Sequence, residues 1–225
     1  KAARQIGATT KNTGTQAAEA LENLSRAGLK ARESISALPG VVALSDAGNK
    51  DMAFSTELLT TALAAFNLEA DDSDKVVNTL FASTTRSRLD LDRLKEAFQQ
   101  GGAVASIYGL KLEETVSIFG KLVDAGLEGG NAGTYLKNIL GEISVAAADT
   151  NGVLGEALRD WDVSTDGIIG VVERLEDAAV QTRTPLDELG KRAGPGLAIL
   201  LRVGSKALRE MESDVTGTND AFEAQ

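Results

Sequence analysis

The sequence predicts an all-α fold: a multi-helix bundle or an array of helical hairpins, with short glycine-capped turns and no β-sheet. Apolar residues recur at the spacing of one helix face, as Ala17, Ala20, Leu21 and Leu24 do in the first such run. No stretch sustains the apolar–polar alternation of a half-buried strand, and no Asn-Gly turn joins two candidate strands. Gly, Asn or Asp followed by one apolar residue ends the helical runs. These three observations all favour helices.

Two longer runs, at 52–66 and 113–127, carry the same period. Their apolar residues repeat at intervals of three and four and should face a core. These residues are Met52, Leu58, Leu59, Ala62, Leu63 and Phe66 in the first run, and Val116, Ile118, Phe119, Leu122 and Val123 in the second. Aromatic residues make up only 4% of the chain, so Ala, Leu and Val must fill most of that core. Such small side chains suit helices that approach each other closely.

Five residue pairs have the pattern of a helix end, in which a left-handed residue is followed by an apolar residue that packs back on the last turn. These pairs are Gly28-Leu29, Asn67-Leu68, Gly109-Leu110, Gly126-Leu127 and Asp162-Val163. We expect positive φ at the three glycines and at least partial burial of the leucines that follow them. An acidic residue or Asn then stands four or five positions later, where it favours the first turn of the next helix. These residues are Glu33, Asp71, Glu113, Asn131 and Asp166.

Other boundaries follow from caps and helix breakers. Asp51 and Asp90 are predicted N-caps or first-turn acids, and "TPLDEL" at 184–189 places Thr184 as the N-cap of another helix. Pro39 lies inside an apolar run, so a helix either kinks or begins there. The run Gly194-Pro195-Gly196 should break the chain between two helices. The segment "GLEGGNAG" at 126–133 is predicted to be a flexible turn between helices.

The residues that most enzymes use are scarce. The chain has no His and no Cys, which removes imidazole bases, thiolate nucleophiles and nearly every zinc or haem site. "EADDSDK" at 69–75 lacks the glycine and closing glutamate of a calcium-binding loop, and is better explained as acids at a helix start. The glycine-rich segment at 126–133 lacks the Gly-Lys-Ser/Thr of a phosphate-binding loop. We therefore predict no enzyme activity, no cofactor, and no catalytic, cofactor-binding or metal-binding residues.

Charge and hydropathy narrow the choice of partners. The net charge is −10, made up of +3 in residues 1–50 and −13 in residues 51–225. Because phosphate contacts need clustered Lys and Arg, we expect no direct nucleic-acid binding. No segment has the ~20 apolar residues of a membrane span, and the longest candidate, at 194–204, is interrupted by Arg202. The sequence opens without a signal peptide and reads as a piece of a longer polypeptide.

A series of short motifs resembles the shared core region of tail tape-measure proteins from long-tailed phages and prophages. In order these are "SRAGL", "SALPG", "DAGNKD" and "AFNLEADD", followed by "YGLKLEET" and "DAGLEGGNAGTYL". In the last of them Gly126, Gly129, Gly133, Thr134 and Leu136 match the family's pattern. The resemblance is strong over residues 15–145 and looser over 153–175, while the stretch "STTRSRLD" at 83–90 departs from it. No single motif is specific, but their ordered series is.

The resemblance implies a structural module of the virion tail, assembled in the host cytoplasm. Residues 1–150 would form the tape-measure core module, and 151–225 a continuing helical segment packed on it. The implied role is in tail-length determination and tail assembly, with tail tube, tail tip and tail assembly chaperone proteins as partners and possible homo-oligomers. The alternative is a cell-wall-degrading or membrane-active module used in DNA ejection. Glycine residues end helices frequently along the chain. This favours a compactly folded module within the tape-measure protein over an extended helix that sets tail length.

Overall fold

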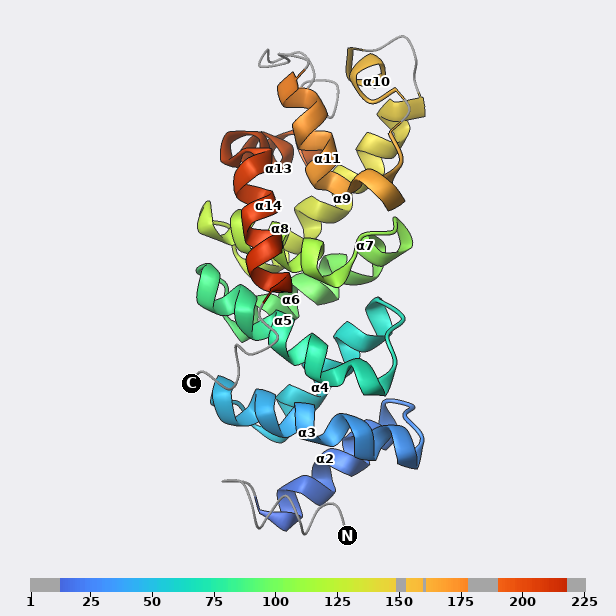
Figure 1. Cartoon of the computed structure of the whole chain (residues 1–225), viewed down its shortest axis with the longest axis vertical. Coiled ribbons are helices and arrows are strands. Elements are labelled where there is room, and N and C mark those ends of the chain that lie inside the picture. The colour runs from blue at the N-terminus through green and yellow to red at the C-terminus, as the bar shows by residue number, and fades with distance from the viewer. Residues whose placement is uncertain (1–12, 149–152, 160, 178–189, 218–225) are drawn as a thin grey trace. The chain divides into compact units, whose positions relative to one another are not determined.

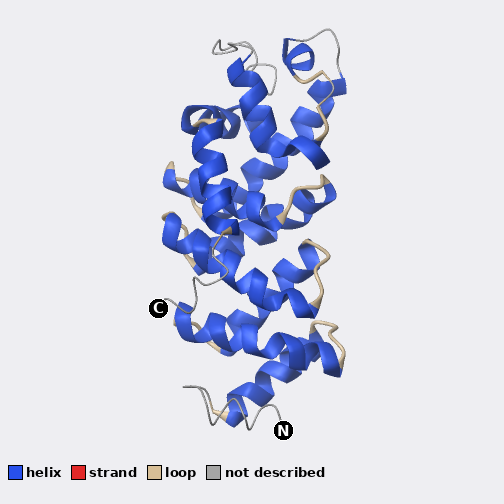
Figure 2. Ribbon diagram, in the orientation of Figure 1, coloured by secondary structure: helices blue, strands red, loops and turns tan. Residues whose placement is uncertain are grey.

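A computed structural model describes residues 13–148, 153–159, 161–177 and 190–217. Every regular element within these ranges is a helix, and no strand occurs among them (Figure 1, Figure 2). The predicted all-α class is therefore confirmed. Contacts divide the chain into two compact units with the boundary after Phe81, inside helix α5 (Ser73–Arg86). The predicted division into 1–150 and 151–225 concerns modules of the longer protein and stays a prediction.

The first unit consists of three mutually packed helices and the short segment that follows them. Its elements are α2 (Gly14–Arg26), α3 (Ala31–Gly48), α4 (Met52–Ala65), a 3₁₀ turn η1 (Ala70–Asp72) and the first part of α5. Leu24, Leu38 and Leu59 are fully or almost fully buried in its core. Helix α3 continues through Pro39, whose ring is exposed, so no new helix begins there. Gly40 faces α5 and α4, where a Cβ would lie 3.1 Å from the Cβ of Ser73 and 3.5 Å from Cδ2 of Leu59.

The second unit, Ala82–Gly217, is built around helix α8. Its elements are α6 (Leu91–Ala97), a π-helical turn η2 (Phe98–Gly102), α7 (Ala103–Ile107), α8 (Leu112–Asp124), α9 (Gly129–Ala148), α10 (Val153–Ala157), α11 (Val163–Asp177), α13 (Gly190–Val203) and α14 (Ser205–Thr216). Helix α8 is buried along nearly its whole length and contacts α6, α9, α13 and α14. Phe98 and Phe119 meet edge to face with ring centroids 5.7 Å apart.

Four of the five predicted helix ends have the expected left-handed turn. Gly28, Asn67, Gly109 and Gly126 have φ of 100°, 50°, 88° and 101°. In each turn the N–H of the following leucine donates to the carbonyl five residues back, at 2.9–3.2 Å, which is the hydrogen bond of a Schellman motif. Of these four leucines, Leu110 is buried and the other three are half-buried. Asn49, with φ of 48°, ends α3 in the same way and was not predicted.

The fifth predicted helix end is wrong. Asp162 does not have positive φ and starts a helix. Its side chain accepts a hydrogen bond from the N–H of Ser164 at 2.8 Å, and its carbonyl accepts one from the N–H of Asp166 at 2.8 Å. Hydrogen bonds from Ser164 to the carboxylate also lower the pKa of Asp162. The short side chain of Asp allows it to end a helix in the left-handed conformation or to start one as the N-cap. The sequence pattern did not distinguish these two roles.

The predicted N-caps are confirmed where the structure describes them. Asp51 and Asp90 accept hydrogen bonds from the N–H groups of Phe54 at 2.7 Å and Arg93 at 2.8 Å. The acids of 69–75 act as predicted at a helix start: Asp72 accepts from the N–H of Glu69, three residues before it. Thr184 and Pro185 lie outside the described residues.

Two segments that were predicted to interrupt helices are wholly or mostly helical. Glycines in both segments lie where two helices pack closely together. Helix α13 runs through Gly194-Pro195-Gly196, and a Cβ on Gly196 would lie 2.9 Å from the ring of Tyr135 on α9. In the segment 126–133 only the first residues form a turn, since α9 begins at Gly129. A Cβ on Gly129 would lie 2.1 Å from the carbonyl oxygen of Arg93 on α6. The predicted flexible turn is therefore the tight crossing of α9 over α6.

Replacing Gly109 by Val should destabilise the protein more than replacing Gly126 by Val. Both substitutions incur the left-handed penalty of about 1–2 kcal/mol. A Cβ at Gly126 would meet no atom within 4 Å, whereas one at Gly109 would lie 3.0 Å from the Cβ and 3.1 Å from the Cα of Ser164. Urea unfolding of the two variants measures the difference, and an unchanged midpoint in Gly109→Val would contradict the turn assignment.

Candidate functional site

A connected group of polar side chains in the second unit surrounds the start of helix α11. We call it the α11 junction, formed by Glu114 of α8, residues 161–169 and 174 at α11, and Arg209 and Glu212 of α14. Its central residue is Glu114, whose exposed fraction is 8%. One carboxylate oxygen, Oε1, accepts hydrogen bonds from the N–H groups of Ile168 at 2.7 Å and Ile169 at 3.2 Å.

Gly167 makes this contact possible. Its backbone has φ 60° and ψ −169°, a conformation that essentially only glycine adopts, and it interrupts the helical geometry of α11. The helix resumes at Ile168 with its first N–H groups directed at Glu114. A Cβ on Gly167 would lie 2.2 Å from Oε1 of Glu114, so a side chain here would displace the carboxylate. Glu114 thus caps a helix from 54 residues away in the chain.

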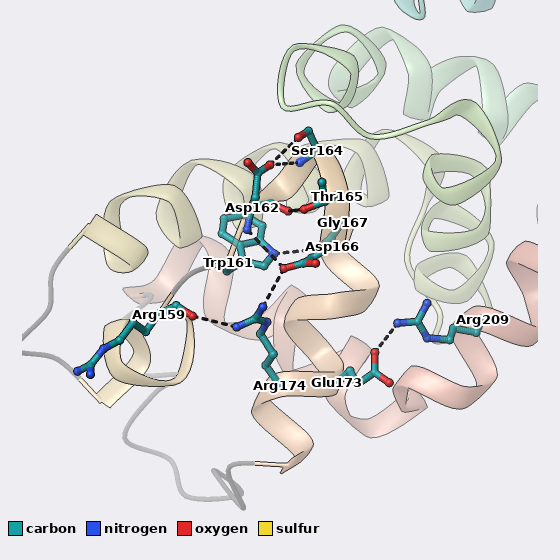
Figure 3. Close-up of polar contacts among 10 residues, drawn as sticks. All are labelled: Arg159, Trp161, Asp162, Ser164, Thr165, Asp166, Gly167, Glu173, Arg174 and Arg209. Atoms are coloured by element: carbon teal, nitrogen blue, oxygen red, sulfur yellow. Dashed lines mark hydrogen bonds and ion pairs between the residues drawn. The ribbon is translucent and has the colours of Figure 1, made fainter.

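Contacts of Trp161 and Arg174 fix the segment before Gly167 (Figure 3). Trp161 donates its indole N–H to the carbonyl of Gly167 at 3.1 Å. Arg174 joins two parts of the segment, because its guanidinium donates to the carbonyl of Arg159 and to the carboxylate of Asp166, both at 2.9 Å. Glu173, on the same helix, is ion-paired with Arg209 of α14. The backbone conformation at Gly167 is therefore held from several sides.

A polar cavity of about 120 Å³ lies beside Glu114. Lys111, Asp166, Arg209 and Glu212 bring charges of both signs to its walls. Burial raises the pKa of Glu114 to about 7, against the two backbone hydrogen bonds and Arg209, which lower it, while Glu212 adds to the rise. Burial also raises the pKa of Glu212. The junction can therefore exchange a proton near neutral pH.

Two other helices are capped by carboxylates from distant helices. Glu176 of α11 accepts hydrogen bonds from the backbone N–H, at 3.1 Å, and the hydroxyl of Ser205 at the start of α14. Glu96 of α6 accepts one from the N–H of Gly130 in the first turn of α9, at 3.3 Å. Unlike Glu114, both of these carboxylates are on exposed residues. Both carboxylates cap the start of a helix, and neither contact includes a reactive group.

No residue was predicted for a site, and the structure adds Glu114 as a residue that sequence reasoning missed. Its only signal was the pair Glu113-Glu114 in the first turn after Gly109-Leu110, which also fits an ordinary acidic helix start. Among the described residues no group of three or more acidic side chains is arranged to hold a metal ion. Within the same residues, no helix combines the length and apolar character needed to cross a bilayer.

Three small residues on helix faces, Ala62, Ala65 and Gly133, are largely internal. Ala62 is completely buried against neighbouring helices of the first unit, and Gly133 is buried against α6. Only Ala65 of that set is partly exposed. The large apolar side chains with the greatest exposure among the described residues are instead Ile35, Ile107 and Val145.

The part of the chain that the structure describes is a helical array in which the starts of α9, α11 and α14 are capped by carboxylates from other helices. The chain belongs to the phage-related minor tail protein family, whose pattern matches residues 1–197. It is 28% identical over 229 residues to the tape measure protein of Pneumococcus phage Dp-1, covering 96% of this chain and 20% of that protein. It is 27% identical over 216 residues to the probable tape measure protein of Escherichia phage P2, covering 91% of this chain and 26% of that protein.

These relatives confirm the resemblance to tape-measure proteins and the predicted place in the virion tail. The chain spans about a fifth to a quarter of the length of the curated relatives it matches. No solved structure matches it.

Proposed function

We propose that this chain is a folded, non-enzymatic module of a tail tape-measure protein that contributes to tail assembly and to contacts with tail tube and tip proteins. The observation that carries the proposal is similarity to two phage tape-measure proteins over more than nine-tenths of the chain. The absence of His and Cys from the sequence supports a structural role. Tail proteins are the partners proposed for the exposed side chains of Ile35 and Ile107.

The folded state bears on how the chain would contribute to tail length. As one continuous helix, 225 residues would extend ~340 Å at 1.5 Å per residue. Helices of 5 to 20 residues separated by left-handed turns do not extend in this way. The module would therefore form part of the tape-measure protein without adding the length of a continuous 225-residue helix to the tail.

Deleting residues 13–217 from the full-length protein in the phage genome tests this proposal. An extended helix of that size would shorten the tail by about 300 Å. We expect instead either a much smaller change or failure to assemble tails, because a module that contacts other tail proteins is lost. Electron microscopy of lysates measures tail length, and an equal-length deletion elsewhere in the same protein is the control.

Shortening by the full ~300 Å would contradict a folded module. The alternative, a cell-wall-degrading or membrane-active module, makes a separate prediction for the purified protein. Clearing of a cell-wall suspension by residues 1–225 would overturn the non-enzymatic proposal, and leakage from lipid vesicles would favour the membrane-active alternative.

A further inference from the structure

We propose that Glu114 and the start of α11 form a proton-operated latch, which holds α11 against α8 when the carboxyl is neutral and loosens when it is ionised. The proposal concerns motion within the second unit and goes beyond the structural role in the tail. It depends on three features of the α11 junction: the two hydrogen bonds to one oxygen, the polar cavity, and the glycine that interrupts α11.

Both backbone N–H groups bind the same oxygen of Glu114. Ile168 and Ile169 donate to Oε1, and no hydrogen bond from the backbone of α11 reaches Oε2. A neutral carboxyl keeps its carbonyl oxygen as an acceptor with two lone pairs and carries its proton on the other oxygen. Protonation on Oε2 therefore preserves both bonds to α11, and the ionised state is not required for the cap.

Ionisation, by contrast, places a charge in a confined site. Glu114 is almost completely buried, and Arg209, the α14 cation that lines its cavity, is already ion-paired with Glu173. Glu212 on α14 adds negative charge at the same cavity, where Asp166 is ion-paired with Arg174 and Lys111 is the N-cap residue of α8. Moving the start of α11 away would admit water to the carboxylate, which favours the ionised form.

Gly167 directs the N–H groups of Ile168 and Ile169 at Glu114. Its own conformation is fixed by contacts of Trp161 and Arg174. Its left-handed backbone separates the segment 161–166 from the regular helix that begins at Ile168. The contacts of Trp161 and Arg174 secure this segment to α11 itself, and neither side chain donates to α8 in these contacts. Across the two helices, the bonds from Ile168 and Ile169 to Glu114 are therefore the polar link that protonation can modulate.

The direction of the pH dependence follows from linkage. The pKa of Glu114 is about 7 with the latch closed, against an ordinary value of 4.5 when the carboxyl is in water. The closed state binds the proton more tightly, so closure is fully favoured below about pH 4.5 and weakens as pH rises through 7. Each pH unit within that window changes the opening equilibrium by up to tenfold. Between pH 5 and pH 8 the protection of the two amides should fall more than about tenfold.

Amide hydrogen exchange at Ile168 and Ile169, corrected for the intrinsic rate at each pH, tests the proposal on the whole chain. Wild-type protection should fall from pH 5 to pH 8. Glu114→Gln retains an acceptor oxygen without a charge, so its protection should match the wild type at pH 5 and stay constant up to pH 8. Glu176→Gln, at the exposed cap of Ser205, is the matched control and should leave the wild-type pH profile of Ile168 and Ile169 unchanged.

Carboxyl ¹³C chemical shifts of Glu114 locate the proton independently and should titrate near pH 7. The proposal is overturned if Glu114 titrates near 4.5, if the amides are equally protected at pH 5 and pH 8 in the wild type, or if Glu114→Gln keeps the wild-type pH profile. Loss of protection in Glu114→Gln at every pH, with the rest of the unit still protected, would also overturn it, since the charge would then be needed for the cap.

Discussion

Gly133→Ala should destabilise the second unit by about 1–3 kcal/mol or more, the usual cost of overpacking a tight contact. A Cβ on Gly133 would lie 2.3 Å from the carbonyl oxygen and 3.0 Å from the Cα of Ala97 on α6. These are backbone atoms, which cannot rotate out of the way, so α9 and α6 would have to separate. The separation would extend to η2, because a Cβ on Gly101 would itself lie 2.5 Å from the carbonyl oxygen of Gly133.

Gly141→Ala, on the same helix, is the matched control and should have the opposite sign. A Cβ there would meet no atom within 4 Å, so the variant should gain up to about 1 kcal/mol from the better helix propensity of alanine. Urea unfolding monitored by circular dichroism compares the two variants with the wild type. Equal stability of Gly133→Ala and Gly141→Ala would show that α9 and α6 do not cross as closely as described.

Gly167→Ala should destabilise the protein by about 3 kcal/mol. Its φ of 60° with ψ −169° costs a residue with a Cβ about 1–3 kcal/mol, and the new methyl would also displace the Glu114 carboxylate from the N–H groups of Ile168 and Ile169. Loss of a hydrogen-bonded cap adds roughly 1 kcal/mol. Gly126→Ala, with φ of 101° and open space around the new Cβ, shows the cost of a positive φ without a clash.

A double-mutant cycle separates the two costs. Glu114→Ala removes the atoms that the methyl of Gly167→Ala would strike, so the double variant should lose less stability than the sum of the single variants. The stability that the double variant loses relative to Glu114→Ala should be comparable to the loss in Gly126→Ala. Strict additivity of the two substitutions would show that Gly167 and Glu114 act independently.

The sequence could predict those parts of the fold that depend on neighbouring residues. A Schellman turn needs only a residue that tolerates positive φ and an apolar residue after it, and so Gly28, Gly109 and Gly126 could be identified as helix ends. The N-caps at Asp51 and Asp90 are equally local. Membership of the tape-measure family was likewise recognisable, because it rests on an ordered series of such local motifs.

Features that depend on distant partners could not be predicted. Gly126 and Gly129 stand three residues apart in one glycine-rich segment, yet the first supplies a left-handed turn and the second admits the backbone of α6. Nothing in the segment itself distinguishes the two uses. Glu114 was missed for the same reason, since its partners lie 54 and 55 residues further along the chain.

The capping of one helix by a carboxylate from another affects how the second unit can fold. The N–H groups of Ile168 and Ile169 have their acceptor only when α8 is already in place, and those of Ser205 and Gly130 similarly depend on α11 and α6. These helix starts are therefore less stable in the isolated segments than in the assembled unit. Formation of these helix starts is therefore coupled to docking, and partial unfolding of α8 would remove the acceptor at the start of α11.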